Sequence, residues 1–448
     1  MKIQKIQIGQ KPVYIKSSDN EDIYELFLQI DQEYENCFFL ESLGEEGRMS
    51  RYAILGFDPQ SVIKGNDASV SIDDKTQNVA NPYRVLEQLM PQKTISRGYA
   101  GGLVGYLGYN AMNFFEPSLS LKPHPLFDSF LFGIYTDGVI FDKITGELFY
   151  FYYNVNRLDR ILKLLKTKIL NKKIFITHLS QTTSKQEHKH MVEKIKQEIL
   201  RGNTFQTVIG LQQEFKIKGN PIVLYDRLRK VNPSPFMYYV KFGDKKIIGA
   251  SPELLFGLRD GEMATFPLAG TIKRGKTEKE DQELAKQLLN TPKEIAEHSM
   301  LVDLHRNDIG KVARFGSVKV RSLMDIKRFS HVQHISSEIV GLIKPTETAF
   351  SALASNFPAG TLTGAPKIEA MKIIERLEKK PRGPYGGAVG HFGFNNDCTF
   401  AIPIRTIFIS GNYGFIQAGS GVVADSTAEG EYAEIQNKLE AMRKVLQQ

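Results

Sequence analysis

Two short stretches of this chain carry glutamates at helical spacing. Glu294 and Glu297 lie three residues apart, as do Glu431 and Glu434 near the C-terminus. Each pair is preceded by a Ser or Thr with a Glu three residues later, a capping-box pattern that predicts the start of a helix. Residues three apart share a helix face, so each helix presents two carboxylates on one side. Two such helices could hold a hard, oxygen-preferring cation between them, which indicates an enzyme that acts on an anionic substrate.

Glycine-containing turns and one arginine indicate recognition of carboxylates. Residues 358–367 and 417–421 each contain two glycines near a predicted helix, so backbone N–H groups can approach an anion there. Arg405 lies in an apolar, strand-like run at residues 401–406, where a charge is costly without an anionic partner. No Gly-x-Ser-x-Gly nucleophile motif occurs. The pattern therefore predicts metal-assisted acid–base chemistry rather than covalent catalysis.

Composition and charge exclude several classes of protein. Of 448 residues, 42% are hydrophobic and 24% are charged, which is typical of a folded, soluble protein. The net charge is +8, but the lysines are scattered and no nucleic-acid-binding motif accompanies them, so we expect no nucleic-acid partner. Only two cysteines, Cys37 and Cys398, are present, which excludes a disulfide framework. Without a signal-peptide pattern or an apolar run of roughly 20 residues, we expect a cytoplasmic protein with no membrane partner.

A polar stretch at residues 180–185 divides the chain into two predicted regions. Residues 1–180 are rich in strand patterns, and residues 186–448 alternate between helix and strand patterns. In the second region, residues 237–242 and 246–250 flank a Gly-Asp pair and predict a hairpin. We expect the two regions to pack together as one globular unit.

Seven sequence stretches form an ordered set. They are residues 249–253, 267–271, 297–308, 360–367, 385–390, 404–406 and 417–426. In this order they resemble the chorismate-utilising enzymes, and among them the anthranilate synthase component I family. The similarity is strong over residues 190–446 and weaker over residues 35–125. One such match would be weak, whereas seven in order argue against a chance similarity.

The resemblance implies an α+β fold in which antiparallel β-sheets pack as a sandwich with helices on the outside. It implies a lyase that converts chorismate and ammonia to anthranilate and pyruvate with Mg²⁺, the first step of tryptophan biosynthesis. Because this chain has no glutamine-hydrolysing cysteine centre, ammonia would come from a separate glutamine amidotransferase subunit, anthranilate synthase component II. We expect residues 186–448 to bind chorismate and residues 1–180 to contribute feedback elements.

The resemblance also assigns roles to the acidic and basic residues. Glu297 and Glu434 would hold Mg²⁺, with Glu294 and Glu431 in or beside its coordination sphere. The carboxylates of the substrate would be positioned by a larger set: Thr361, Tyr385, Arg405, Gly419, Gly421 and Lys438.

The expected catalytic residues are Glu253, His298, Gln206 and Thr271. Glu253 would be the general acid that helps the C4 hydroxyl of chorismate leave, because hydroxide is a poor leaving group. His298 would serve the later step, in which pyruvate is eliminated and the ring becomes aromatic.

Two positions discriminate among the members of the family. Gln206 lies where the water-using isochorismate and salicylate synthases resemble one another in having a lysine base. Glutamine cannot deprotonate water, so ammonia is the expected nucleophile. Ala269 lies where many aminodeoxychorismate synthases carry a lysine that attacks the substrate. Alanine cannot make that attack, so this position indicates direct amination at C2.

Two further segments resemble the tryptophan-binding site of the family. Their residues are Leu40, Glu41, Ser42, Pro235, Phe236 and Met237. We therefore expect L-tryptophan to act as a feedback inhibitor.

Two alternatives stay open at this point. One is aminodeoxychorismate synthase component I of the folate pathway, which would yield 4-amino-4-deoxychorismate instead of 2-aminobenzoate. The other belongs to a different class, a non-catalytic basic protein that binds nucleic acid or regulates another protein. Such a protein would show no turnover and, if it bound nucleic acid, a steep dependence of binding on salt.

Overall fold

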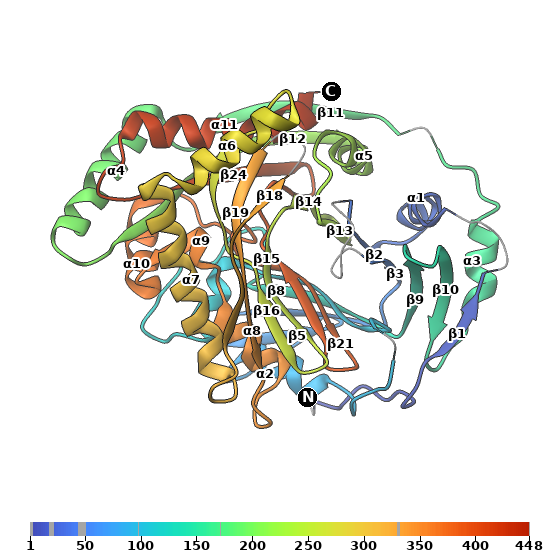
Figure 1. Ribbon diagram of the computed structural model, residues 1–448. Helices are drawn as coiled ribbons and strands as arrows, with labels where there is room; N and C mark the ends of the chain where they lie inside the picture. The colour runs from blue at the N-terminus through green and yellow to red at the C-terminus, as the bar shows by residue number, and fades with distance from the viewer. Residues whose placement is uncertain are drawn as a thin grey trace.

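The computed structural model describes residues 3–17, 22–43, 51–96, 98–170, 172–328 and 332–447. Over these residues, two twelve-stranded antiparallel sheets form the centre of the molecule (Figure 1). The first sheet runs, in spatial order, β1 (Val13–Lys16), β10 (Glu147–Tyr152), β9 (Asp137–Asp142), β3 (Tyr52–Phe57), β2 (Asn36–Glu41), β13 (Phe236–Phe242), β14 (Lys245–Ser251), β23 (Thr406–Ser410), β24 (Tyr413–Val422), β12 (Gln206–Gly219) and β11 (Ile174–Gln181), with β20 (Gly364–Ala365) beside β12.

The second sheet has the same number of strands among the described residues. It runs β17 (Leu268–Lys273), β19 (Val332–Leu342), β16 (Glu262–Thr265), β15 (Leu254–Arg259), β22 (Cys398–Ala401), β21 (Ala388–Gly393), β7 (Gly102–Leu107), β8 (Phe130–Tyr135), β4 (Ser61–Asn66), β5 (Ser69–Ile72) and β6 (Lys75–Asn78), with β18 (Lys319–Arg328) beside β19.

Helices cover the outside of this pair of sheets, and in Figure 1 α4, α7 and α10 lie on the side opposite α1 and α3. The helices are α1 (Ile23–Glu33), α2 (Pro82–Leu89), α3 (Leu158–Leu164), α4 (Lys185–Leu200), α5 (Ile222–Val231), α6 (Glu278–Leu289), α7 (Pro292–Val312), α8 (Ala349–Asn356), α9 (Gly360–Thr363), α10 (Lys367–Leu377) and α11 (Ala428–Gln447), with a 3₁₀ helix at Tyr109–Phe114. Of the helices in the described part of the chain, none is both long and apolar enough to cross a membrane. The expected fold, antiparallel sheets with helices outside, is confirmed.

Both sheets combine strands from both ends of the chain. In the first, β2 pairs with β13, so that Leu40 lies opposite Tyr238. In the second, β7 pairs with β21, so that Gly105 lies opposite Gly390. The predicted hairpin is present as β13 and β14. The division of the chain at residues 180–186 stays a prediction, and any such units share their sheets.

Because side chains alternate between the two faces of the first sheet, this sheet contributes to two hydrophobic clusters. In β13, Tyr238 and Val240 belong to the cluster that includes residues of the second sheet, whereas Met237 and Tyr239 belong to the cluster with α1 and α5. Successive side chains of a strand point to opposite faces, so the first sheet must be apolar on both. This explains why β2 and β13 read as nearly continuous apolar runs.

The two glutamate-bearing helices are present, but their predicted capping boxes are wrong. Thr291 is the N-cap of α7, yet its hydroxyl makes no cap hydrogen bond and instead donates to the Gln287 carbonyl 2.9 Å away. The reason is that α6 runs almost directly into α7, so the hydroxyl is taken by the preceding turn. At α11, the Ser426 hydroxyl donates to the Glu431 carboxylate at 2.7 Å, and Thr427 instead accepts from the Gly430 backbone N–H.

Candidate active site

Glu253 lies where the chain passes from the first sheet to the second, just after β14 and before β15. Its side chain is buried, with 5% of its surface exposed. Burial raises the pKa of Glu253 to about 8, although a hydrogen bond from Thr361, one from the Leu268 backbone, and the charges of Lys438 and Arg405 lower it. The Thr361 hydroxyl donates to Oε1 of Glu253 at 3.0 Å. At neutral pH this carboxyl therefore keeps its proton and can act as an acid.

The turn that carries Thr361 is fixed by close backbone contacts. Gly364 has a φ of +127°, and a Cβ added there would meet the Gln206 carbonyl at 2.1 Å. A Cβ on Gly360 would meet the Leu304 side chain, also at 2.1 Å. The approach at Gly364 requires glycine, and at Gly360 a side chain would displace Leu304, so the turn packs against β12 on one side and α7 on the other.

The pairing of β12 with β24 places Gln206 beside the second glycine turn. Val208 lies opposite Gly421, and Gly210 lies opposite Gly419. A Cβ on Gly421 would meet Nε2 of Gln206 at 2.4 Å, so the glutamine occupies space that the absent side chain leaves. Oε1 of Gln206 is buried and, within the described part of the chain, has no hydrogen-bond partner. This oxygen can accept an N–H from an ammonia molecule, but it cannot take a proton from water.

Arg405, Tyr385 and Lys438 form the basic and phenolic side of the site. Among the described residues, no carboxylate lies within ion-pair distance of Arg405. Burial lowers the pKa of Arg405, and the charges of Tyr385, Glu434 and Glu253 raise it in part. The Lys438 ammonium pairs with Glu434 at 2.6 Å and donates to the Gly419 carbonyl at 2.8 Å. Burial raises the pKa of Tyr385 to about 12, so its hydroxyl stays protonated and can donate to an anion. An arginine without a carboxylate partner is suited to receive one from a substrate.

The two glutamate pairs face a common region. Burial raises the pKa of Glu297; the nearby Lys293 lowers it, and the charges of Glu294, Glu431 and Glu434 raise it further. The pKa of Glu294 is also raised, by burial first and then, against Lys293, by Glu434. The pairs come from α7 and α11, which are far apart in sequence, so the fold brings four carboxylates within electrostatic range.

These carboxylates do not enclose a ready-made coordination sphere. In the parts of the chain that the structure describes, no three His, Cys, Asp or Glu side chains are close enough together to hold a metal ion. Lys293 lies 3.7 Å from Glu297, and one oxygen of Glu431 is buried without a partner. The chemistry of the set nevertheless fits a hard dication, because it offers several carboxylate oxygens whose mutual repulsion such an ion would relieve.

Two histidines are candidates for proton transfer, and sequence analysis found only one. His298 is fully buried, and its Nε2 lies 2.7 Å from the Ser337 hydroxyl. His334, on β19, lies beside Thr271, with Nδ1 3.1 Å from the Thr271 hydroxyl and 2.9 Å from the Gly270 carbonyl. Burial lowers the pKa of each to about 4, and the charges of Arg405 and Lys438 contribute only at His334.

The charges of Arg405 and Lys438 thus act on His334, and both histidines are neutral at pH 7. No local sequence signal singled out His334, because a lone histidine in a strand is usually a packed core residue. The signal that could have found it is its position in β19, opposite Thr271 of β17.

A large cavity lies between strands β2 and β13 and the second sheet. Its volume is about 610 Å³, and it is lined by all six residues of the expected tryptophan site, Leu40, Glu41, Ser42, Pro235, Phe236 and Met237. The Ser42 hydroxyl is buried and has no hydrogen-bond partner among the described residues. The Glu41 carboxylate, in contrast, accepts from Tyr225 at 2.8 Å and from Arg229 at 2.7 Å, so it is already neutralised by α5. The structure thus brings residues 40–42 and 235–237 together in one cavity. Glu41 adds little net negative charge there, because Arg229 neutralises it.

Comparison with known proteins agrees with this arrangement. The model of the family described as chorismate binding enzyme matches residues 35–444. Anthranilate synthase component 1 of Leptospira biflexa is 53% identical, over 99% of this chain and 98% of that protein. The protein of the same name from Methanothermobacter thermautotrophicus is 42% identical, over 95% of this chain and 92% of that one. The crystal structure of anthranilate synthase component I from Streptococcus pneumoniae superimposes with a TM-score of 0.81 at 30% identity, covering 96% of this chain and 98% of that one.

The chain therefore belongs to the chorismate binding enzymes, and within them to the family of anthranilate synthase component 1. The resemblance expected from the seven sequence stretches is confirmed.

The raised pKa of Glu253 predicts a specific dependence of stability on pH. The folded state holds this proton up to about pH 8, whereas the unfolded chain releases it near the ordinary value of 4.5. Between these values the folded state binds more protons, so the free energy of unfolding falls as the pH rises. Glu253→Gln removes this loss and should be more stable than the parent at pH 9, by an amount on the order of a few kcal/mol.

Urea denaturation of the two proteins at pH 6 and pH 9 measures this difference. The Glu253→Gln advantage should grow between the two pH values. An equal difference at both would show that Glu253 is ionised, or exposed to water, throughout.

Proposed function

We propose that this chain is the chorismate-converting component of an anthranilate synthase, which forms anthranilate and pyruvate from chorismate and ammonia. The observation that carries the proposal is the buried, protonated carboxyl of Glu253, held by Thr361 in the field of Arg405 and Lys438. A proton donor beside two cations suits a substrate that has carboxylates and must lose a hydroxyl group. The names of the relatives support the same reaction.

The substrate would be held by its two carboxylates. Arg405 lacks a carboxylate partner among the described residues and would provide a charged, planar fork. The Tyr385 hydroxyl and the N–H groups of the glycine turn at 417–421 would add neutral donors. Because the pKa of Tyr385 is raised to about 12, that donor is retained at all pH values at which the enzyme would work.

Amination needs a donor for the leaving group and an acceptor for the nucleophile. Glu253 would give its proton to the C4 hydroxyl, which leaves as water while ammonia bonds to C2. The unpaired Oε1 of Gln206 would accept an N–H of the incoming ammonia and so orient it. A glutamine at this point selects ammonia over water, because it cannot act as a base.

Aromatisation then needs a base for the proton on C2. A neutral imidazole is required, and burial keeps both His334 and His298 in that form. We favour His334, because Arg405 and Lys438, which would hold the substrate, are within electrostatic range of it. Removal of the C2 proton breaks the C3–O bond and expels enolpyruvate, which takes up that proton to become pyruvate, and the ring is then aromatic.

Mg²⁺ is the metal that we propose for the glutamate set. Glu297 and Glu434 would hold it, with Glu294 and Glu431 close by, as oxygen ligands suit this ion. When bound, it would neutralise the carboxylates and attract the ring carboxylate of the substrate. The lysine contacts of Glu297 and Glu434 are consistent with side chains that exchange an ammonium partner for a metal ion.

L-Tryptophan is the ligand that we propose for the cavity beside Leu40 and Phe236. The cavity has apolar walls suited to an indole ring, and the unpartnered Ser42 hydroxyl is available to the amino-acid group. The nitrogen source would be a glutamine amidotransferase subunit. The two cysteines are buried and unpaired, which is compatible with the reducing conditions of the cytoplasm.

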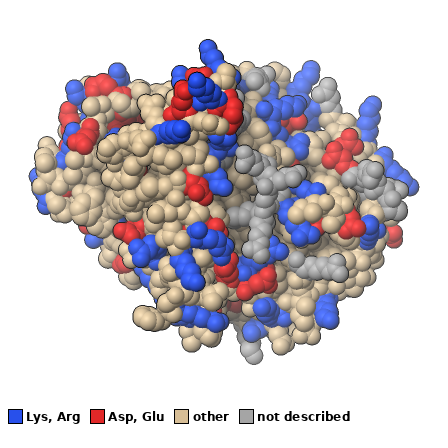
Figure 2. Space-filling model, in the orientation of Figure 1, with Lys and Arg blue, Asp and Glu red and all other residues tan. Residues whose placement is uncertain are grey.

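The alternatives have less support. Ala269 offers no amine for a covalent aminodeoxychorismate mechanism. A nucleic-acid-binding protein would need a continuous basic surface, whereas Figure 2 shows Lys and Arg interspersed with Asp and Glu over the face in view.

The direct test is turnover by the purified chain. With chorismate, Mg²⁺ and ammonium at alkaline pH, we expect a fluorescent product with the mass of anthranilate, and Glu253→Gln should lower kcat by about 10²- to 10⁴-fold. A product with the mass of 4-amino-4-deoxychorismate would favour the folate-pathway alternative. No conversion of chorismate would reject the proposed function.

Replacement of the two histidines separates their roles. His334→Gln should stop aromatisation but leave amination, so that the aminated intermediate accumulates at the expense of anthranilate. His298→Gln, the matched control, should give a lower thermal stability with an unchanged product ratio. Chromatography with mass detection resolves the products; the opposite pattern would return the role to His298.

Metal binding can be measured without turnover. Mg²⁺ at a hundredfold excess over its Kd should stabilise the protein by about 2.7 kcal/mol, and Glu297→Gln should remove most of that effect. Glu429→Gln is the control, because Glu429 is an exposed glutamate at the start of the same helix as Glu434. Equal stabilisation of both variants in thermal melts would place the ion elsewhere.

Feedback inhibition tests the cavity. Ser42→Phe should fill part of it and abolish inhibition by L-tryptophan while leaving kcat and KM for chorismate essentially unchanged, because Ser42 lines the cavity and is not among the residues proposed to act on chorismate. The matched control is Ser410→Phe, because Ser410 lies in β23 of the first sheet but outside the cavity. This variant should still be inhibited by L-tryptophan. Unchanged inhibition of Ser42→Phe would refute the assignment.

A further inference from the structure

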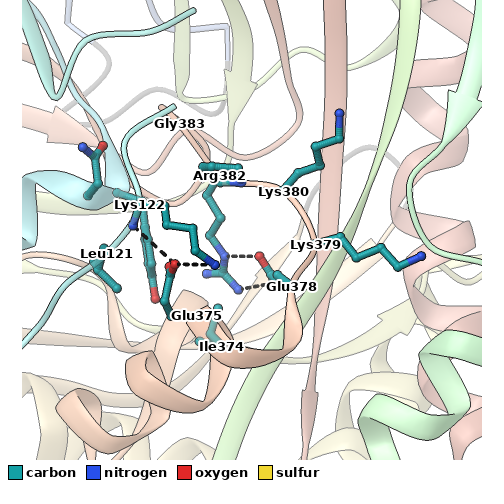
Figure 3. A pocket seen from close by; sticks show the side chains of 12 residues that line it. Leu121, Lys122, Ile374, Glu375, Glu378, Lys379, Lys380, Arg382 and Gly383 are labelled. Atoms are coloured by element: carbon teal, nitrogen blue, oxygen red, sulfur yellow. Dashed lines mark hydrogen bonds and ion pairs between the residues drawn. The ribbon is translucent and has the colours of Figure 1, made fainter. Parts of the chain in front are cut away.

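A buried ion pair lies beside the site but takes no part in the chemistry proposed above. Arg382 and Glu378 have only 2% and 6% of their side chains exposed. Nε of Arg382 donates to one carboxylate oxygen at 2.9 Å and Nη2 to the other at 2.7 Å, as the dashed lines in Figure 3 indicate. Removing two charges from water is costly, so a pair of this kind needs further partners to be tolerated.

The further partners are backbone groups of other segments. Nη1 of Arg382 donates to the Leu362 carbonyl at 2.7 Å, and Nη2 donates to the Val208 carbonyl at 2.8 Å. The Glu378 carboxylate accepts the Gly210 backbone N–H at 2.9 Å. The pair therefore ties α9 and β12 to the loop that follows α10, three segments that are not neighbours in sequence.

Each tied segment carries a residue of the site. Leu362 directly follows Thr361, which holds Glu253. Val208 and Gly210 continue the strand that begins at Gln206, and they lie opposite the glycines of β24. Arg382 itself precedes Tyr385 by three residues, and its guanidinium lies 5.8 Å from the Tyr385 ring centroid and 4.6 Å from that of Tyr109.

A narrow hollow lies on the outer side of the pair. The hollow shown in Figure 3 lies between the pair and solvent, and at about 20 Å³ it has room for roughly one water molecule. Water therefore does not compete strongly with the backbone carbonyls for the guanidinium. A second ion pair in the same hollow, Lys122 with Glu375 at 3.3 Å, is largely exposed on its lysine side, and among the described residues its side chains bond no segment of the site.

We propose that the Arg382–Glu378 pair is a positioning device that fixes Thr361, Gln206 and Tyr385 relative to one another. Neither residue touches the substrate. The inference rests on the proposed function, because it concerns turnover at that site. Lysine cannot replace Arg382, since one ammonium cannot bridge a carboxylate and two carbonyls that lie in different directions.

The test compares variants on a single helical turn and its loop. Arg382→Lys and Glu378→Gln should each lower kcat by at least tenfold at a temperature at which both are folded. Glu375→Gln, one turn earlier in the same hollow, should keep the parental kcat. Thermal melting of each variant sets the temperature of the assay.

The pH profile gives a readout that a loss of stability alone would not move. The Thr361 hydrogen bond lowers the pKa of Glu253, so a displaced Thr361 lets that pKa rise. The alkaline limb of the kcat profile should therefore shift to higher pH in Arg382→Lys and in Glu378→Gln. The Glu375→Gln profile should superimpose on that of the parent.

A double replacement guards against variants that fail to fold. Arg382→Met with Glu378→Leu removes both charges together, which costs less stability than removing one. We expect this variant to fold with a kcat still reduced at least tenfold. Parental kcat and an unshifted pH profile in the folded single or double variants would overturn the proposal. Absence of turnover by the parent would instead reject the proposed function.

Discussion

Charge that is withdrawn from water must be paired, and this constraint organises the region around the site. Arg382 with Glu378 and Lys367 with Asp308 are buried pairs whose groups are fully engaged, at 2.7 Å in each case. The Lys367–Asp308 pair joins α10 to α7, the helix that carries Glu294 and Glu297. Such pairs are costly to break, so they fix the backbone around the centre of the molecule.

The residues at the centre are left incomplete by comparison. Glu253 keeps a proton because it is buried, and Arg405 has no carboxylate within ion-pair distance among the described residues. The glutamates of α7 and α11 repel one another. An arginine without a carboxylate partner, beside mutually repelling carboxylates that are paired only with lysines, suits the joint binding of an anionic substrate and a divalent ion. The surrounding pairs are satisfied internally, whereas the central groups leave room for partners from outside the chain.

Local features of this arrangement could be predicted from the sequence. The glutamate pairs depend only on spacing within a helix, and the β13–β14 hairpin on alternation around a turn. The predicted capping boxes were wrong, because Thr291 bonds to the Gln287 carbonyl of the preceding helix and Ser426 bonds to the Glu431 carboxylate. His334 and Arg382 were missed for a related reason. The partners of His334 lie on another strand, and two of the partners of Arg382, the carbonyls of Leu362 and Val208, lie 20 and 174 residues away, so that only Glu378 is close in sequence.

The long-range arrangement came from family resemblance and not from periodicity. A sheet order that places β2 beside β13 and β7 beside β21 mixes the two ends of the chain, and no local pattern specifies it. The polar stretch at 180–185 illustrates the limit. It reads as a linker, yet β11 ends within it and α4 begins there with a complete capping box at Ser184 and Glu187.

The β13–β14 hairpin has a mechanical consequence. Phe236, in the wall of the large cavity, lies opposite Ser251, two residues before Glu253. A ligand that contacts Phe236 therefore contacts the strand that pairs with the segment leading to Glu253. The cavity and the proton donor therefore share one hairpin, which connects them directly without any movement of whole domains.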